Sequence, residues 1–119
     1  MPRHQPRNHF AEWFTAIHIF QRDGWLSLVE KYAFPSHAAK RQKMEVILGD
    51  RFERFDKLVR NVGGQPPDLL LYTSRGDLAG FAEVKGPGDR VQPRQLRMLR
   101  EIRGLLGVPV ELVSVRLVP

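Results

Sequence analysis

The chain has 119 residues and a mass of 13.7 kDa, which is the size of one domain. It contains no cysteine, which excludes disulfides, cysteine-ligated zinc and a thiol nucleophile. Its 19 basic and 13 acidic residues give a net charge of +6, so nucleic acid is the first partner to consider. No apolar run could span a membrane, and no apolar stretch follows the basic start. We therefore expect no membrane partner, no secretion, and a cytoplasmic or nuclear location.

The first half of the chain is predicted to be mainly helical after a loose, polar arm over residues 1–8. Apolar side chains at helical spacing predict a helix over 9–22; they are Phe10, Trp13, Phe14, Ile17 and Phe20. Residues 25–34 fit a strand or a helix almost equally well. A further helical pattern covers 37–62, as one long helix or as two short helices that meet at Gly49.

The second half predicts three strands and one helix. A short buried strand is expected at 69–72, and a second strand at 81–85 pairs with it through a turn at 74–77. A helix over 93–106 follows, with a proline in its first turn and a glycine after its end. Residues 108–118 alternate in polarity as a last strand. The order of elements predicts an α/β fold with a small mixed sheet.

Acidic and basic side chains are expected to meet at one edge of the predicted hairpin. Asp68 precedes its first strand and Glu83 lies near the end of its second strand, so the two carboxylates should lie close together. Glu83 and Lys85 are two residues apart on one strand and therefore point to the same face. Carboxylate oxygens suit Mg²⁺ or Mn²⁺, and a lysine can hold a water or neutralise a developing oxyanion.

The same residues also have a purely structural interpretation, in which Asp68 caps a turn and Glu83 and Lys85 form an exposed pair. Three features favour the chemical interpretation. The charged pair flanks Val84 in an otherwise apolar strand, where burying a charge costs free energy unless a partner compensates it. The loop Gly-Pro-Gly-Asp-Arg that follows lets the backbone approach a ligand closely. Gln95 lies in the first turn of a helix aimed at the same edge.

These motifs resemble those of a known family. The residues that carry the resemblance are Gly-Gly-Gln-Pro-Pro-Asp-Leu at 63–69, Glu-Val-Lys-Gly-Pro-Gly-Asp-Arg at 83–90, and Gln95. They are similar to the virus-type replication-repair nuclease (VRR-NUC) branch of the PD-(D/E)XK nuclease superfamily, which includes the C-terminal domain of the Fanconi-associated nuclease. The resemblance covers 63–118. It implies a single domain over 1–119 with a restriction-endonuclease-like core and a helical insert at about 37–62.

The resemblance also implies roles for individual residues. Asp68 and Glu83, with the carbonyl of Val84, would bind Mg²⁺ or Mn²⁺. Lys85 would position the attacking water and stabilise the pentavalent phosphate. Gln95 would orient the water or Lys85. The glycine-rich loop is not followed by Lys-Ser or Lys-Thr, so no nucleotide cofactor is expected.

Members of the family have a further acidic residue upstream. The first candidate is Glu30, because Gly24-Trp25 resembles the Gly-aromatic pair that precedes this acid in the Fanconi-associated type. The strand interpretation of 25–34 also places Glu30 on the inward face, and as an acid of the site it would join the metal ligands. Glu12 on the first helix is the alternative, because short members of the family have an acid there.

Basic side chains predict the surface that contacts DNA. Arginines recur at every third position of the helix that begins beside the site, and Arg90 lies in the glycine-rich loop; the helix arginines are Arg94, Arg97, Arg100 and Arg103. A row of mostly one sign is suited to phosphate contacts. The charges of 37–62 alternate in sign and instead predict a solvated face with pairs three or four residues apart.

The resemblance implies a metal-dependent, structure-specific endonuclease that hydrolyses phosphodiester bonds in branched DNA, a four-way junction or a flap, during repair, recombination or replication. The alternatives are a DNA-structure-binding module that does not cut and a restriction-type endonuclease. Short members of the family resemble junction resolvases, so a homodimer is expected. Its interface is predicted on the apolar side chains of the helical insert, namely Phe52, Phe55 and Val62.

Overall fold

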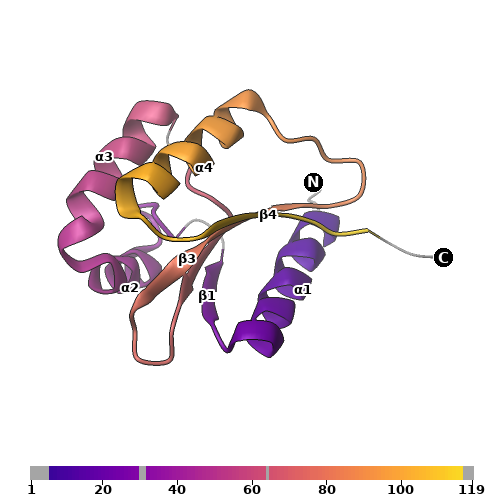
Figure 1. Ribbon diagram of the computed structural model, residues 1–119, viewed down its shortest axis with the longest axis horizontal. Helices are drawn as coiled ribbons and strands as arrows, with labels where there is room; N and C mark the ends of the chain where they lie inside the picture. The colour runs from indigo at the N-terminus through magenta and orange to yellow at the C-terminus, as the bar shows by residue number, and fades with distance from the viewer. Residues whose placement is uncertain (1–5, 30–31, 64, 117–119) are drawn as a thin grey trace.

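The structure is a computed structural model that describes residues 6–29, 32–63 and 65–116, with side chains from Phe10 onward (Figure 1). Its elements in chain order are α1 (Pro6–Asp23), β1 (Leu26–Val29), α2 (Ala38–Leu48), the short 3-10 helix η1 (Gly49–Arg51), α3 (Phe52–Val62), β2 (Leu69–Tyr72), β3 (Leu78–Lys85), α4 (Pro93–Leu106) and β4 (Val110–Ser114). Within this part of the chain, no helix is long and apolar enough to cross a bilayer.

The four strands form one sheet in the order β1-β2-β3-β4. β1 pairs with β2 and β2 pairs with β3 in antiparallel fashion, whereas β4 runs parallel to β3 after the crossover through α4. The sheet is therefore mixed, as the sequence predicts. Leu69 at the start of β2 lies opposite Val29 on one side and Ala82 on the other, which brings the end of β1, the start of β2 and the end of β3 to one edge.

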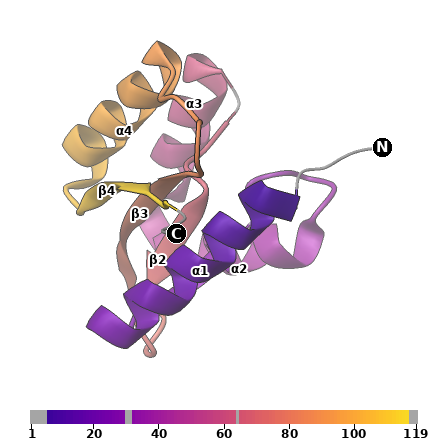
Figure 2. The ribbon, with the colours of Figure 1, turned by 90° about the vertical axis from the view of Figure 1, so that its right-hand side faces the viewer.

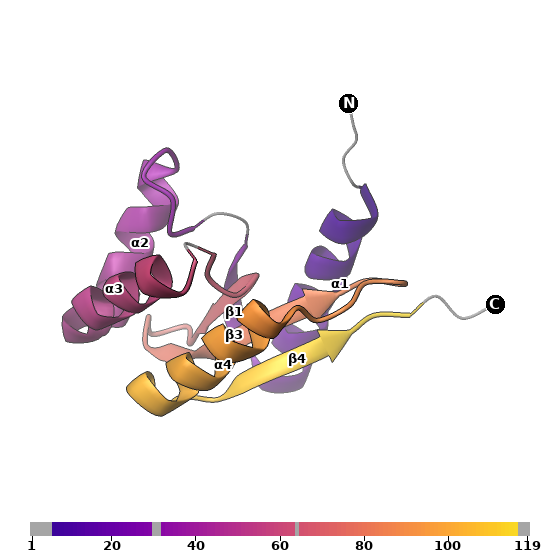
Figure 3. The same cartoon turned by 90° about the horizontal axis from the view of Figure 1, so that it is seen from above.

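Two apolar cores cover the two faces of the sheet. On one face, Leu70 and Phe81 pack with buried side chains of α2, α3 and α4, and the rings of Phe55 and Phe81 stack 5.3 Å apart. On the other face, Leu69, Leu71, Ala82 and Val84 pack against α1. Figures 2 and 3 show α1 on the opposite side of the sheet from α3 and α4.

Most predicted elements are confirmed, with differences at their ends. The strand at 69–72 and the helix at 93–106 have the predicted bounds, and the helical segment is two helices joined at Gly49, whose φ of +58° favours glycine. The second strand starts earlier than expected, at Leu78, and the last strand is shorter, ending at Ser114. The 25–34 segment holds a four-residue strand.

The prediction of a loose arm over 1–8 is wrong for residues 6–8, because α1 begins at Pro6. Proline is well placed in a first helical turn, where its missing N–H has no partner to lose. Residues 1–5 lie outside the described part of the chain.

The apolar side chains predicted to cover a partner belong to the core instead. Phe55 and Val62 are buried between α3 and the sheet, and Phe52 packs against the same cluster. The prediction of an interface there is wrong, because the short sheet needs α2 and α3 to cover its face. Among the described residues, α1 has the largest group of exposed large apolar side chains, five in number.

Candidate active site

The two carboxylates of the predicted hairpin meet at the sheet edge. Because Leu69 pairs with Ala82, the residues next to them, Asp68 and Glu83, lie beside each other. The N–H of Val84 donates to Asp68 Oδ2 at 2.8 Å, and the N–H of Asp68 donates to Glu83 Oε1 at 3.3 Å. Each carboxylate is therefore held by a backbone N–H at the end of the hairpin.

Lys85 joins this pair as predicted. It lies two residues after Glu83 on the same face of β3, and its Nζ is 3.7 Å from Glu83 Oε2. The side chain of Lys85 is only 13% exposed and that of Glu83 only 7%. The purely structural interpretation, an exposed pair on the surface, is therefore wrong.

Gln95 reaches the site from the first turn of α4. Its Nε2 donates to Glu83 Oε2 at 2.9 Å, while its Oε1 accepts a hydrogen bond from the N–H of Gln92 at 2.9 Å. One carboxamide thus caps the helix and fixes Glu83. The expected contact with Lys85 is replaced by this contact with Glu83.

Tyr32 is a residue of this site that the sequence analysis missed. Its hydroxyl donates to the carbonyl of Pro67 at 2.6 Å, and its side chain is buried. This bond holds the peptide directly before Asp68. The only sequence signal was a tyrosine in the ambiguous segment, and the long-range contact could not be derived from spacing.

Burial raises the pKa values of both carboxyl groups. The pKa of Glu83 rises from 4.5 to about 7, first because the side chain is desolvated and second because Asp68 is close; Lys85 opposes the shift. Desolvation also raises the pKa of Asp68, against the hydrogen bond from Val84 and the charge of Lys85. Two desolvated carboxylates repel each other when both are ionised, so a cation bound between them would stabilise the ionised pair.

A pocket of about 280 Å³ opens at these residues. Its wall includes Asp68, Glu83 and Gln95, together with Arg94, Pro66 and Pro67. The two carboxylates thus face a space large enough for an ion with waters or phosphate oxygens.

The donor set fits a hard divalent cation. Mg²⁺ is usually bound by one or two carboxylates, with waters and phosphate oxygens completing its octahedron. The site has two carboxylates that could bind the cation. Among the described residues, no group of three acidic or histidine side chains lies close enough together to hold a metal ion. The first predicted third acid, Glu30, lies outside the described residues.

The alternative third acid, Glu12, lies on α1 with its Oε1 buried. The residue before it, Ala11, packs in the same cluster as Leu69 and Val84, at the end of the sheet where the site lies. The position of Glu12 therefore keeps it a candidate.

The predicted DNA-contacting arginines are all exposed, but they do not form one row; they are Arg90, Arg94, Arg97, Arg100 and Arg103. Residues three apart on a helix turn back by about 60° at each step, so the α4 arginines spread over about half of the helix circumference. Arg94 lies over Gly63, where an added Cβ would be 2.7 Å from its Cδ, and lines the pocket. Arg97 is paired with Glu101 at 2.8 Å.

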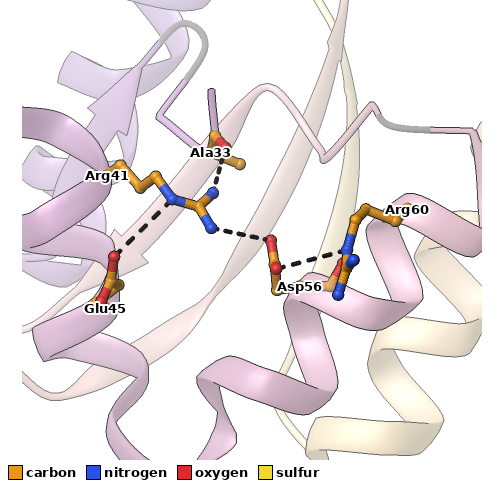
Figure 4. A network of polar contacts seen from close by, with 5 residues as sticks. All are labelled: Ala33, Arg41, Glu45, Asp56 and Arg60. Atoms are coloured by element: carbon orange, nitrogen blue, oxygen red, sulfur yellow. Dashed lines mark hydrogen bonds and ion pairs between the residues drawn. The ribbon is translucent and has the colours of Figure 1, made fainter. Parts of the chain in front are cut away.

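The mixed charges of α2 and α3 form the pairs that were expected, and one pair also joins the two helices. Arg41 contacts Glu45 four residues on at 3.8 Å, contacts Asp56 of α3 at 3.3 Å, and donates to the carbonyl of Ala33 at 2.6 Å (Figure 4). Asp56 is also paired with Arg60. This network fixes the segment after β1 that contains Tyr32.

A mixed sheet between helices, with two carboxylates and a lysine at the end of one hairpin, defines the restriction-endonuclease-like class of folds. The model of the VRR-NUC domain family matches residues 7–117, and the chain belongs to this family. Over 91 residues it is 33% identical to Fanconi-associated nuclease 1 of Danio rerio, an alignment that covers 72% of this chain and 9% of that protein. The chain therefore spans about a tenth of the length of this relative.

Proposed function

We propose that the protein is a divalent-metal-dependent endonuclease that hydrolyses phosphodiester bonds in branched DNA, a four-way junction or a flap. The observation that carries the proposal is the convergence of Asp68, Glu83 and Lys85 at the end of the β2–β3 hairpin, facing a pocket. Membership of the VRR-NUC family and the likeness to a Fanconi-associated nuclease support it.

The chemistry follows from the side chains of the site. Mg²⁺ or Mn²⁺, held by Asp68, Glu83 and the carbonyl of Val84, would polarise the phosphate and lower the pKa of a bound water. Both carboxylates must be ionised to hold it, and Gln95 keeps Glu83 oriented while this happens. Lys85 carries the positive charge that stabilises the oxyanion developing on the phosphate.

A third acid completes the proposed site. β1 ends at Val29 opposite Leu69, the residue after Asp68, so this strand ends at the edge where the site lies. Glu30 follows Val29 in the chain, which supports it as the third acid. Glu12 is the alternative. Metal affinity that falls in Glu30→Gln and not in Glu12→Gln would assign the role to Glu30, and the reverse would assign it to Glu12.

The proposed DNA surface is the exposed side of α4 together with the loop that contains Arg90. Arg94 lines the pocket itself, which supports a contact between its guanidinium and the phosphate beside the scissile bond. Phosphate contacts fix the position of a duplex and carry no base sequence. Recognition of DNA shape is therefore the expected basis of substrate choice.

The test is cleavage of end-labelled four-way junction, flap and plain duplex DNA with Mg²⁺, Mn²⁺ or EDTA. The wild type is expected to cut the branched substrates only when metal is present. Lys85→Ala and Asp68→Asn should lose cleavage while DNA affinity is retained. Asp77→Asn is the matched control, because Asp77 is an exposed aspartate at the far end of the same hairpin.

The outcomes separate the three function classes. Salt-sensitive binding to branched DNA without cutting by either metal would make the protein a binding module. Cutting of plain duplex at one sequence would make it a restriction-type enzyme. Either result would overturn the proposal.

A further inference from the structure

The first turn of α2 has two basic side chains that bond to the chain around the end of β1. Lys40 Nζ donates to the carbonyl of Val29, the last residue of β1, at 2.8 Å. Arg41 Nη1 donates to the carbonyl of Ala33 at 2.6 Å (Figure 4). Both hydrogen bonds are partly buried, where a carbonyl that loses its donor costs more free energy than on an exposed surface.

Arg41 is itself held by α3 and by its own helix. Its Nη2 lies 3.3 Å from Asp56 Oδ1 on α3, and its Nε lies 3.8 Å from Glu45 Oε2 (Figure 4). Its guanidinium also lies over the ring of Phe52, 5.3 Å from the ring centroid. A planar guanidinium with these partners has a fixed direction, so the bond to the carbonyl of Ala33 is fixed as well.

The contact with Ala33 leads to one chain neighbour of Asp68. Ala33 follows Tyr32, whose buried hydroxyl donates to the carbonyl of Pro67 at 2.6 Å. Pro67 is the residue directly before Asp68. Arg41 therefore fixes the backbone next to Tyr32, and Tyr32 fixes the backbone next to Asp68.

The contact with Val29 leads to the other chain neighbour of Asp68. Val29 is paired with Leu69 between the antiparallel strands β1 and β2, and Leu69 is the residue directly after Asp68. Because Lys40 holds Val29 by its carbonyl, it also holds the end of β1 beside the start of β2. The two basic side chains thus act on the backbone on both sides of Asp68.

We propose that Lys40 and Arg41 are positioning residues that keep Asp68 in the geometry in which it binds a divalent cation. Asp68 also accepts a hydrogen bond from the N–H of Val84, and a carboxylate that is already oriented loses less freedom when it binds an ion. The helices α2 and α3 therefore support the site as well as covering the sheet. The inference rests on the proposed function, because it concerns metal binding by Asp68.

The test is the affinity of the full chain for Mn²⁺, measured by calorimetric titration well below the temperature of unfolding. Lys40→Met and Arg41→Ala should each raise the dissociation constant about three- to tenfold, because groups behind a metal ligand set its orientation. Once Tyr32→Phe has removed the hydroxyl, Arg41→Ala should raise the constant by less than about twofold more. Losses that multiply in full would overturn the route from Arg41 through Tyr32.

Two other basic residues of α2 and α3 are the matched controls. Lys43 is also on α2, but its Nζ lies 5.0 Å from the ring centroid of Tyr72, at the far end of β2. Arg60 is paired with Asp56, the same carboxylate that Arg41 contacts. Lys43→Met and Arg60→Ala should therefore leave the Mn²⁺ affinity unchanged.

Amide hydrogen exchange reports the same geometry without metal, because the N–H of Val84 donates to Asp68 Oδ2 at 2.8 Å. Exchange at Val84 should be faster in Arg41→Ala than in Arg60→Ala. The N–H of Phe81, which is bonded within the core of the fold, is the internal reference. Global loosening would speed exchange at Phe81 as much as at Val84, and that result would overturn a specific role for Arg41.

Circular dichroism shows whether each variant folds, and the milder Arg41→Lys is measured beside Arg41→Ala. Unchanged Mn²⁺ affinity and Val84 exchange in folded Lys40→Met and Arg41→Ala overturn the inference, as does an equal loss of affinity in Lys43→Met. A wild type that binds no Mn²⁺ overturns the proposed metal-dependent function, and the exchange rates at Val84 then decide the positioning of Asp68 separately.

Discussion

Glu83 connects the chemistry of the site to the stability of the fold. Its pKa in the folded protein is about 7, above its ordinary value of 4.5, so the folded state holds this proton more tightly than the unfolded chain does. The stabilisation that the folded state gains by binding this proton more tightly is fully present below about pH 4.5 and is lost as the pH rises through about 7. Asp68 is shifted in the same direction. The site is thus less stable in the ionised form that metal binding requires.

We therefore predict that the metal-free protein loses on the order of 1–3 kcal/mol of unfolding free energy as the pH rises through this window. Urea denaturation at a series of pH values measures the effect. Mg²⁺ or Mn²⁺ should restore the lost stability at the upper end, because a cation replaces the proton. Glu83→Gln should flatten the pH dependence; an unchanged slope in this variant would assign the effect to other groups.

Tyr32 acts on the site through the backbone, and this makes a second prediction at the scale of single residues. Tyr32→Phe removes the hydroxyl that holds the carbonyl of Pro67 and leaves a buried acceptor without its donor. We expect a loss of about 1–3 kcal/mol in unfolding free energy and a several-fold weaker affinity for Mn²⁺, since Asp68 follows that carbonyl. Denaturation and calorimetric titration measure the two effects.

The control for Tyr32 lies at the opposite end of β2. Tyr72→Phe changes a half-buried tyrosine far from the pocket and should leave Mn²⁺ affinity unchanged. Equal loss of Mn²⁺ affinity in both variants would show that Tyr32 has no specific part in positioning Asp68.

The elements differ in how far their sequences determine them. β2 and α4 were predicted to the residue because their patterns are self-contained: a short leucine run for β2, and a helix bounded by Pro93 and Gly107. α1 was found as a helix, but its buried face could not be predicted. Periodicity identifies an apolar face, and only the sheet decides that the small face around Ala11 packs inward.

The candidate site was predictable to the extent that it depends on one hairpin. The register of β2 and β3 follows from their lengths and the turn, so the meeting of Asp68, Glu83 and Lys85 could be derived. Gln95 was predicted to belong to the site, but its bond to Glu83 depends on how α4 docks. The contact of Tyr32 depends on the path of the chain after β1, which no local pattern determines.

A glycine in β3 shows how closely the elements pack. A Cβ at Gly80 would lie 2.5 Å from the carbonyl oxygen of Pro109, in the connection from α4 to β4. We predict that Gly80→Ala lowers the unfolding free energy by about 1–3 kcal/mol, because backbone must move to accept the methyl group. Gly104→Ala in α4 is the control: nothing lies within 4 Å of its added Cβ, so it should stabilise the helix by about 0.5–1 kcal/mol. Thermal unfolding compares the two; equal destabilisation would contradict the close-packing argument.

At the scale of the whole molecule, the two sides of the sheet have different chemistry. One side has the pocket and the arginines of α4, and the other has five exposed large apolar side chains of α1, from Phe10 to Phe20. The exposed arginines of α4 and the exposed apolar side chains of α1 therefore lie on opposite sides of the sheet.

The salt dependence of DNA binding tests this division of surfaces. Each phosphate contact contributes about −0.9 to the slope of log affinity against log salt, so Arg94→Ala at the pocket should reduce the magnitude of this slope by about that amount. Arg103→Ala should change the slope less, because residues 94 and 103 lie on opposite sides of α4. Arg97→Ala should change it less, because Arg97 is already paired with Glu101. Arg75→Ala, an exposed arginine in the turn at the far end of the hairpin, is the control. A slope that changes equally in Arg75→Ala and Arg94→Ala would mean that net charge, and not the side chains of α4, attracts the DNA.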